Sequence, residues 1–100
     1  MLKGHKKNNM DLKKAFLMSY YNEKDGKISL KGRVLKNLKT GDNLYLLNSD
    51  TMLVEHKYII KKIYAYQLEF GIIDEGMTCE LILSGEKTTF KEDSIFYLLI

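Results

Sequence analysis

Two lysines and two tyrosines lie close together in the middle of the chain, at Lys61, Lys62, Tyr64 and Tyr66. Tyrosine rings can stack on bases and lysines neutralise phosphates, so proteins that bind single-stranded nucleic acid use this combination. If Tyr64 and Tyr66 share an outward face, they form such a platform, and Arg33 on another strand adds charge. Alternatively, the tyrosines pack across a barrel with only their hydroxyls in water. These five residues are therefore the candidate binding site, with packing as the other interpretation.

The sequence does not predict an enzyme. Catalysis needs a nucleophile with a base, paired carboxylates in a cleft or a metal site, and no such combination is visible. Cys79 lies on the apolar side of an alternating segment, which predicts a buried thiol. The acids at 74–75 and 92–93 fall in predicted turns. With His5 and His56 as the only histidines, a zinc site lacks ligands. We expect no catalytic residues, no metal and no cofactor.

The composition predicts one globular domain. The chain has 100 residues, of which 45% are hydrophobic and 29% are charged. Its net charge of +3 is uneven: residues 1–14 carry five lysines and one aspartate, or +4, whereas residues 15–100 carry 11 cations and 12 acids, or −1. We therefore expect a flexible basic tail over 1–14 and a folded domain over 15–100. No apolar run approaches the ~20 residues that cross a bilayer, so we expect no membrane association and a cytoplasmic location.

Alternating apolar and polar residues indicate β-strands over most of the domain. The segments with this pattern are residues 15–21, 28–37, 43–48, 52–70, 77–85 and 94–100. An Asp-Gly pair at 25–26 favours a tight turn, and Gly32 marks a place where the barrel bends sharply or another strand approaches closely. Short strands with tight connections favour closure, which removes exposed edges. The prediction is an all-β fold, a small closed antiparallel barrel of six or seven strands.

Two segments need separate interpretation. Residues 52–70 contain no Gly or Pro, and their alternation changes parity, which predicts two strand segments joined by a bulge near Lys61 and Lys62. Residues 86–93 form a polar connection that Phe90 anchors. The residues expected in the barrel interior are Ile28, Leu30, Val34, Leu44 or Tyr45, Ile60, Cys79, Leu81 and Ile95.

The order of these segments resembles the second domain of translation elongation factors, a small β-barrel that follows the GTPase domain. The matching pieces are FLM (16–18), GRVLKNLKTGD (32–42), the strand with Ile59 and Ile63, DEG (74–76), LILSG (81–85) and SIFYL (94–98). The resemblance covers nearly all of 15–100. It implies a barrel similar to a module that contacts aminoacyl-tRNA ends, ribosomal RNA or a neighbouring domain. Two positions depart from that pattern, Asp93 in place of a glycine and Tyr64 where those factors use an acid.

These observations predict a non-enzymatic binding module that contacts RNA-associated machinery or a protein partner. GTP binding is not expected, because the chain has no phosphate-binding loop of the GxxxxGK[ST] type. The final segment is apolar on both faces of the expected strand, so a homodimer through the C-terminal strand is an alternative. A further alternative is an accessory subunit of a separately encoded enzyme.

Overall fold

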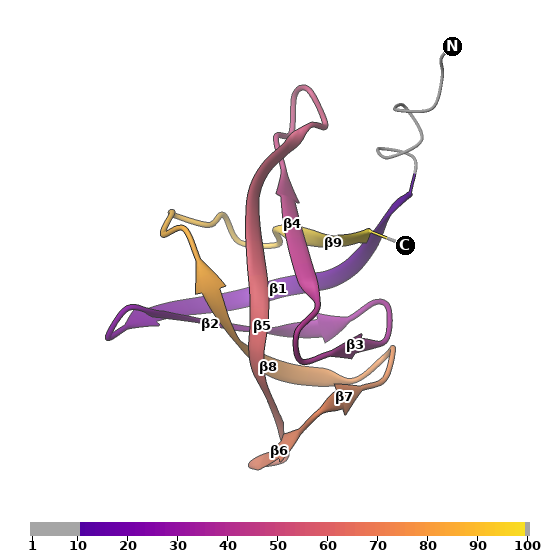
Figure 1. Cartoon of the computed structure of the whole chain (residues 1–100), viewed down its shortest axis with the longest axis vertical. Helices are drawn as coiled ribbons and strands as arrows, with labels where there is room; N and C mark the ends of the chain where they lie inside the picture. Colours follow the sequence, from indigo (N-terminus) through magenta and orange to yellow (C-terminus); the bar gives the residue numbers. More distant parts are fainter. Residues whose placement is uncertain (1–10, 100) are drawn as a thin grey trace.

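The structure is a computed structural model that describes residues 11–99 (Figure 1). These residues form nine strands and no helix: β1 (Leu12–Lys24), β2 (Lys27–Val34), β3 (Leu38–Lys39), β4 (Asn43–Leu47), β5 (Val54–Ala65), β6 (Leu68–Phe70), β7 (Ile72–Ile73), β8 (Thr78–Gly85) and β9 (Ile95–Leu99). No helix long and apolar enough to span a membrane occurs in this part of the chain.

Six strands close into a ring. The main sheet has the order β4-β9-β1-β2-β8-β5-β6, and β4 also pairs with β5, which closes the ring and leaves β6 outside it. All pairings are antiparallel, while β3 and β7 form a separate two-stranded sheet. The predicted antiparallel all-β barrel is confirmed, although the ring is uneven. The strands β1 and β5 have 13 and 12 residues, whereas β4 and β9 have five each.

Two tight turns connect long antiparallel strands. Asp25 and Gly26 have φ values of 54° and 78°, as a two-residue turn between twisted strands requires, so the predicted Asp-Gly turn joins β1 to β2. Tyr66 and Gln67 have φ values of 53° and 65° and turn the chain from β5 back into β6. The predicted bulge near Lys61 is also present, because the β5–β8 register shifts between Ile60 and Lys62. The reversal at 66–67 was not predicted, since neither residue is a typical turn former.

The core fills the ring with side chains from every long strand. The buried hydrophobic residues are Ala15, Phe16, Met18, Ile28, Leu30, Val34, Leu38, Leu44, Tyr58, Ile60, Ile63, Ala65, Ile73, Cys79, Leu81, Leu83, Phe90 and Phe96. All the predicted interior positions are among them except Ile95, which is half-buried. Phe96 lies opposite the buried Phe16 on β1, and residues opposite one another in an antiparallel pair share a face. Phe96 therefore points inward in place of Ile95.

Gly32 is buried where β1 and β2 come closest. A Cβ atom on this residue would overlap the Leu17 carbonyl oxygen, and it would lie 2.9 Å from the Leu17 carbonyl carbon. The β1–β2 register shifts directly beside this point, between Met18 and Tyr20. The predicted close approach of another strand at Gly32 is confirmed.

The first strand begins earlier than the sequence suggested. Lys13 and Lys14, which we assigned to the basic tail, lie in β1 opposite Leu98 and Tyr97 of β9. Backbone pairing with β9 accounts for this difference, because it does not depend on apolar side chains. Residues 1–10 of the expected tail lie outside the described residues.

Candidate functional site

The predicted binding residues on β5 face different surroundings. Lys61 lies at the β5 bulge, and Lys62 lies opposite Ile82 on β8; both are exposed. Tyr64 is half-buried, and its cross-strand neighbours are the acids Glu80 and Glu69. The immediate neighbours of this ring across the strands are thus anionic.

The other two predicted residues lie in a turn and on another strand. Tyr66 is 77% exposed and stands in the turn between β5 and β6. Arg33 is exposed on β2, two strands from β5, and its β8 partner is Thr78, whereas the β8 partner of Lys62 is Ile82. Four residues along a strand span about 13 Å. The structure therefore places Lys61, Lys62, Tyr64 and Tyr66 along β5 and the turn that follows it, with Arg33 on another strand, and a binding role for the five stays a prediction.

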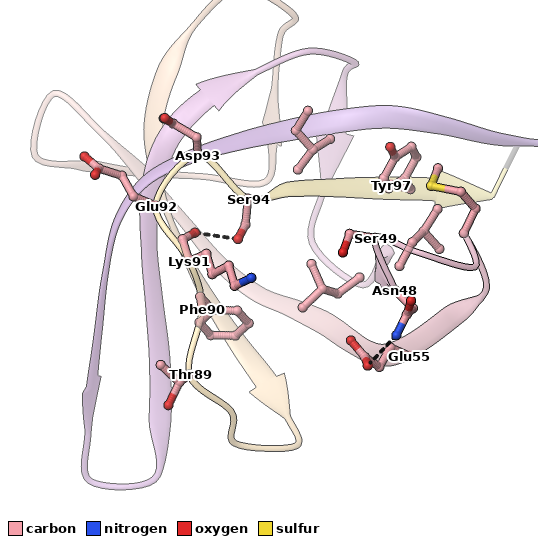
Figure 2. Close-up of a pocket in the computed structure, with 14 residues that line it drawn as sticks. Asn48, Ser49, Glu55, Thr89, Phe90, Lys91, Glu92, Asp93, Ser94 and Tyr97 are labelled. Atoms are coloured by element: carbon pink, nitrogen blue, oxygen red, sulfur yellow. Dashed lines mark hydrogen bonds between the residues drawn. The ribbon is translucent and has the colours of Figure 1, made fainter.

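A groove lies where β4 and β9 pair and close the ring (Figure 2). We call it the seam groove; it has a volume of about 580 Å³. The hairpin connecting β4 to β5 forms one side, and the connection preceding β9 forms the other. The residues that line it are Leu46, Leu47, Asn48, Ser49, Met52, Glu55, Thr89, Phe90, Lys91, Glu92, Asp93, Ser94, Ile95 and Tyr97. Three of them are aliphatic, Met52 and Phe90 are also apolar, and the others carry polar groups, so the groove combines an apolar lining with hydrogen-bonding groups.

Asn48 shapes the hairpin side of the groove. Its side-chain oxygen accepts hydrogen bonds from the backbone N–H groups of Asp50 (2.8 Å) and Thr51 (3.0 Å), a pattern typical of Asx turns. Its side-chain nitrogen donates to the Glu55 carboxylate at 3.3 Å, as Figure 2 shows. The backbone carbonyl of Asn48 accepts from the Met52 N–H at 2.7 Å. These bonds give the loop a defined conformation.

This loop leads into three exposed apolar side chains in succession. Met52, Leu53 and Val54 are 53%, 55% and 47% exposed, and we call them the apolar lip. Met52 has a φ of 60°, which is uncommon for a residue other than glycine. A run of three exposed apolar residues is uncommon on a domain surface, and such runs often have a functional reason.

A tight turn shapes the opposite side of the groove. The Lys91 carbonyl accepts hydrogen bonds from the backbone N–H (3.1 Å) and the hydroxyl (2.5 Å) of Ser94. Asp93 has a φ of 67°, so it adopts the backbone conformation that a glycine would favour at this position. The Asp93 N–H donates to the Met18 carbonyl at 3.1 Å, which ties the turn to β1.

An aromatic cluster lies behind the groove. The Phe90 ring contacts the rings of Tyr21, Tyr58 and Phe96, with centroid distances of 5.0, 5.7 and 5.5 Å. Burial, and then the charges of Glu86 and Glu55, raise the pKa of Tyr58 to about 12. Phe90, which was predicted to anchor the connection, is therefore both buried and part of the groove wall.

Within residues 11–99, the remaining titratable groups include a buried thiol and no metal-ligating cluster. No group of three metal-ligating side chains is close enough to hold an ion in this range. His56 pairs with Glu86 at 2.5 Å, on the barrel surface. Burial, followed by the charge of Glu80, raises the pKa of Cys79 to about 12, so the thiol stays protonated at neutral pH.

The strand pairing defines a small antiparallel β-barrel domain, with a groove at its seam. No protein-family model matches the chain, and no curated protein matches it. Among solved structures, the fold is similar to the crystal structure of the C-terminal domain of a Geobacillus thermoleovorans protein described as a U32 peptidase. The TM-score is 0.58 and the identity 14%, and the alignment covers 96% of each chain. At this identity the similarity shows a shared fold.

This comparison corrects the expected family. The structural match is to a peptidase-associated domain, so the assignment to the second domain of translation elongation factors is wrong. The predicted function as a translation-factor-like, RNA-binding module loses its basis with it. The residues that suggested it have local roles: Gly41 has a φ of 94°, and the Asp42 carboxylate accepts the Lys39 N–H at 3.0 Å. Any barrel with this turn needs such residues, so they do not distinguish families.

Sequence reasoning missed the seam groove because two loops distant in sequence build it. One available signal was the run of three apolar residues at 52–54 directly after a polar turn. A second was the C-terminal strand that is apolar on both faces: Ile95 and Tyr97 on its outer face line the groove, and Leu99 is 51% exposed. A homodimer through this strand stays a prediction.

Proposed function

We propose that the chain is a non-catalytic accessory barrel domain that binds an extended segment of a polypeptide in the seam groove. The observation that carries this proposal is the apolar lip beside a groove with an aliphatic and polar lining. The similar domain belongs to a protein described as a peptidase, an enzyme class that acts on polypeptides. That description supports a polypeptide as the ligand of this chain.

An extended peptide matches the groove chemically. Its side chains can pack on Leu46, Leu47 and Ile95, while its backbone donors and acceptors can pair with polar groups such as the hydroxyls of Thr89 and Tyr97. Concave ligand sites usually have volumes of roughly 300–1,000 Å³, and the groove lies within that range. Methionine at the lip suits adaptable contacts, because its side chain is flexible and polarisable.

We propose a binding role and not catalysis because the side chains that line the groove do not form a nucleophile–base pair. They include no cysteine or histidine, and the Ser94 hydroxyl donates to the Lys91 carbonyl. An absence of GTP binding and a cytoplasmic location stay predictions from the sequence.

The test measures binding of a reduced, alkylated and unfolded protein to the immobilised chain. Met52→Asp should weaken binding at least ~10-fold, because it places a charge on the lip where apolar contact is needed. Ile72→Asp is the matched control: Ile72 is 62% exposed on β7, at the opposite end of the molecule from the β4–β5 hairpin (Figure 1). We expect this control to bind as the unaltered chain does.

Three outcomes would contradict the proposal. They are no binding of the unfolded protein by the unaltered chain, equal losses in both variants, or competition by RNA at equal concentration that removes all binding. Circular dichroism of both variants verifies that each keeps the strand content of the parent, so a loss of binding is not a loss of fold.

A further inference from the structure

Tyr58 carries a buried polar atom that lacks a partner. The side chain is 0% exposed, and among the described residues its hydroxyl makes no hydrogen bond. Buried hydroxyls are nearly always bonded, because leaving one unpaired is unfavourable compared with its bonds to water. This hydroxyl can therefore still donate and accept a hydrogen bond, although it lies in an apolar interior.

Phe90 contacts both Tyr58 and the seam groove. One side of its ring packs on Tyr58 in an edge-on arrangement, with an interplanar angle of 62°. The residue also lines the groove, where Figure 2 shows it between Thr89 and Lys91. Moving this one ring out of the cluster would extend the groove toward Tyr58.

The segment that carries Phe90 is weakly held. Residues 87–90 make no backbone hydrogen bond in the described part of the chain; backbone bonds resume at the turn that starts with Lys91. Lys87 pairs with Glu23 at 3.2 Å, but both side chains are well exposed, and exposed pairs contribute little. The Phe90 ring is thus the main anchor of its own segment, and such segments open more readily than paired strands do.

We propose that the seam groove opens at Phe90 and takes an aromatic ring that carries a hydrogen-bond acceptor. The incoming ring replaces Phe90 against Tyr21, Tyr58 and Phe96, and its acceptor receives the hydrogen bond of the Tyr58 hydroxyl. This inference rests on the proposed function for the source of the ring, which is a tyrosine side chain of the bound polypeptide. The site then recognises a tyrosine anchor within an extended segment.

Because the incoming ring only replaces Phe90, its hydrogen-bond acceptor determines which rings bind most tightly. The entering ring recovers the aromatic contacts that Phe90 gives up, so ring burial by itself contributes little net affinity. The hydrogen bond to Tyr58 is new, because no described group satisfies the hydroxyl in the closed form. A ring with an acceptor should therefore bind about five- to tenfold more tightly than the same ring without one.

The experiment compares acetophenone with α-methylstyrene, two planar rings of similar shape that differ in whether they carry a carbonyl oxygen. Amide chemical shifts of the full chain report the affinity of each probe. We expect acetophenone to bind five- to tenfold more tightly, with the largest shifts at residues 86–94. Tyr58→Phe should abolish the preference. Phe90→Leu, chosen because Phe90→Ala risks unfolding, should tighten the binding of both probes by leaving space for a ring.

Equal affinities in the unaltered chain, a preference that persists in Tyr58→Phe, or no binding of either probe would each overturn the inference. The small probes do not require polypeptide binding, so these outcomes are separate from the test with unfolded protein. Binding of the unfolded protein without any preference for acetophenone would reject the ring site and leave the proposed function intact.

Discussion

The barrel has a regular wall and an irregular seam. In the wall, β2 pairs with β1 from Lys27 to Val34 and with β8 from Ile28 to Arg33. At the seam, β4 and β9 share two residue pairs, Tyr45 with Tyr97 and Leu46 with Phe96. Continuous pairing makes the wall a rigid scaffold, whereas brief pairing leaves room for two loops and a groove between them. The difference suits the wall to a structural role and places the proposed binding groove at the seam.

The largest expected effect tests the wall at Gly32. In Gly32→Ala, the new Cβ would overlap the Leu17 carbonyl oxygen, so β1 and β2 must move apart at their closest point. Backbone displacement in a packed interior is costly, and we expect a loss of about 3 kcal/mol or more in the free energy of unfolding. Urea denaturation followed by circular dichroism measures this loss.

Gly71→Ala is the matched control for this substitution. No heavy atom lies within 4 Å of a Cβ at that position, apart from the residue's own chain neighbours. Its free energy of unfolding should change by less than about 1 kcal/mol. If both glycine variants lost a similar amount of unfolding free energy, the wall would be no more sensitive to a new Cβ than the loops are. That result would contradict the contrast between wall and seam.

The same division explains how much of the fold was predictable from the sequence. Alternation identified the wall, because residues such as Leu30 and Leu81 repeat every second position and only one face is buried. It failed on β9, where Ile95 and Phe96 are both apolar and only the pairing with Phe16 determines which points inward. It also failed at Tyr66, where tertiary pairing of β6 with β5 imposes a turn that the residue types do not favour.

The candidate site was less predictable than the fold. Lys61, Lys62 and Tyr64 were noticed because they are adjacent in sequence, but adjacency on a strand does not create a concave surface. The groove is lined by the hairpin region at 46–55 and the segment at 89–97, which are about forty residues apart in the chain. Such closure arises from long-range pairing, and a local pattern carries little information about it.

A smaller effect concerns Cys79, the buried thiol in the wall. Burial raises its pKa from an ordinary value of 9.0 to about 12, so above pH 9 the unfolded chain loses this proton while the folded chain keeps it. Stability from this group is therefore complete below pH 9 and declines as the pH rises toward 12. The decline is at most about 1.4 kcal/mol for each pH unit.

Thermal melts at pH 8 and pH 11 measure the decline. We expect the fall in Tm between these two values to be smaller in Cys79→Ala than in the unaltered chain, whatever the offset of the variant at pH 8. An identical fall in both proteins would mean that the thiol titrates normally and that the wall at β8 is accessible to water.

The smallest effect is expected at Tyr58 of β5, in the aromatic cluster behind the seam groove. Replacing this residue by phenylalanine removes the unpaired hydroxyl and keeps the ring contacts with Phe90 and Phe96. Because a buried hydroxyl without a partner is unfavourable, Tyr58→Phe should raise the free energy of unfolding by about 1 kcal/mol. Urea denaturation at pH 7 measures the change, and Tyr45→Phe, a half-buried tyrosine on β4, is the control that should stay within about 0.5 kcal/mol. A loss of stability in Tyr58→Phe would mean that the hydroxyl is hydrogen-bonded in solution. The region behind the seam groove would then have no unpaired buried polar atom at this position.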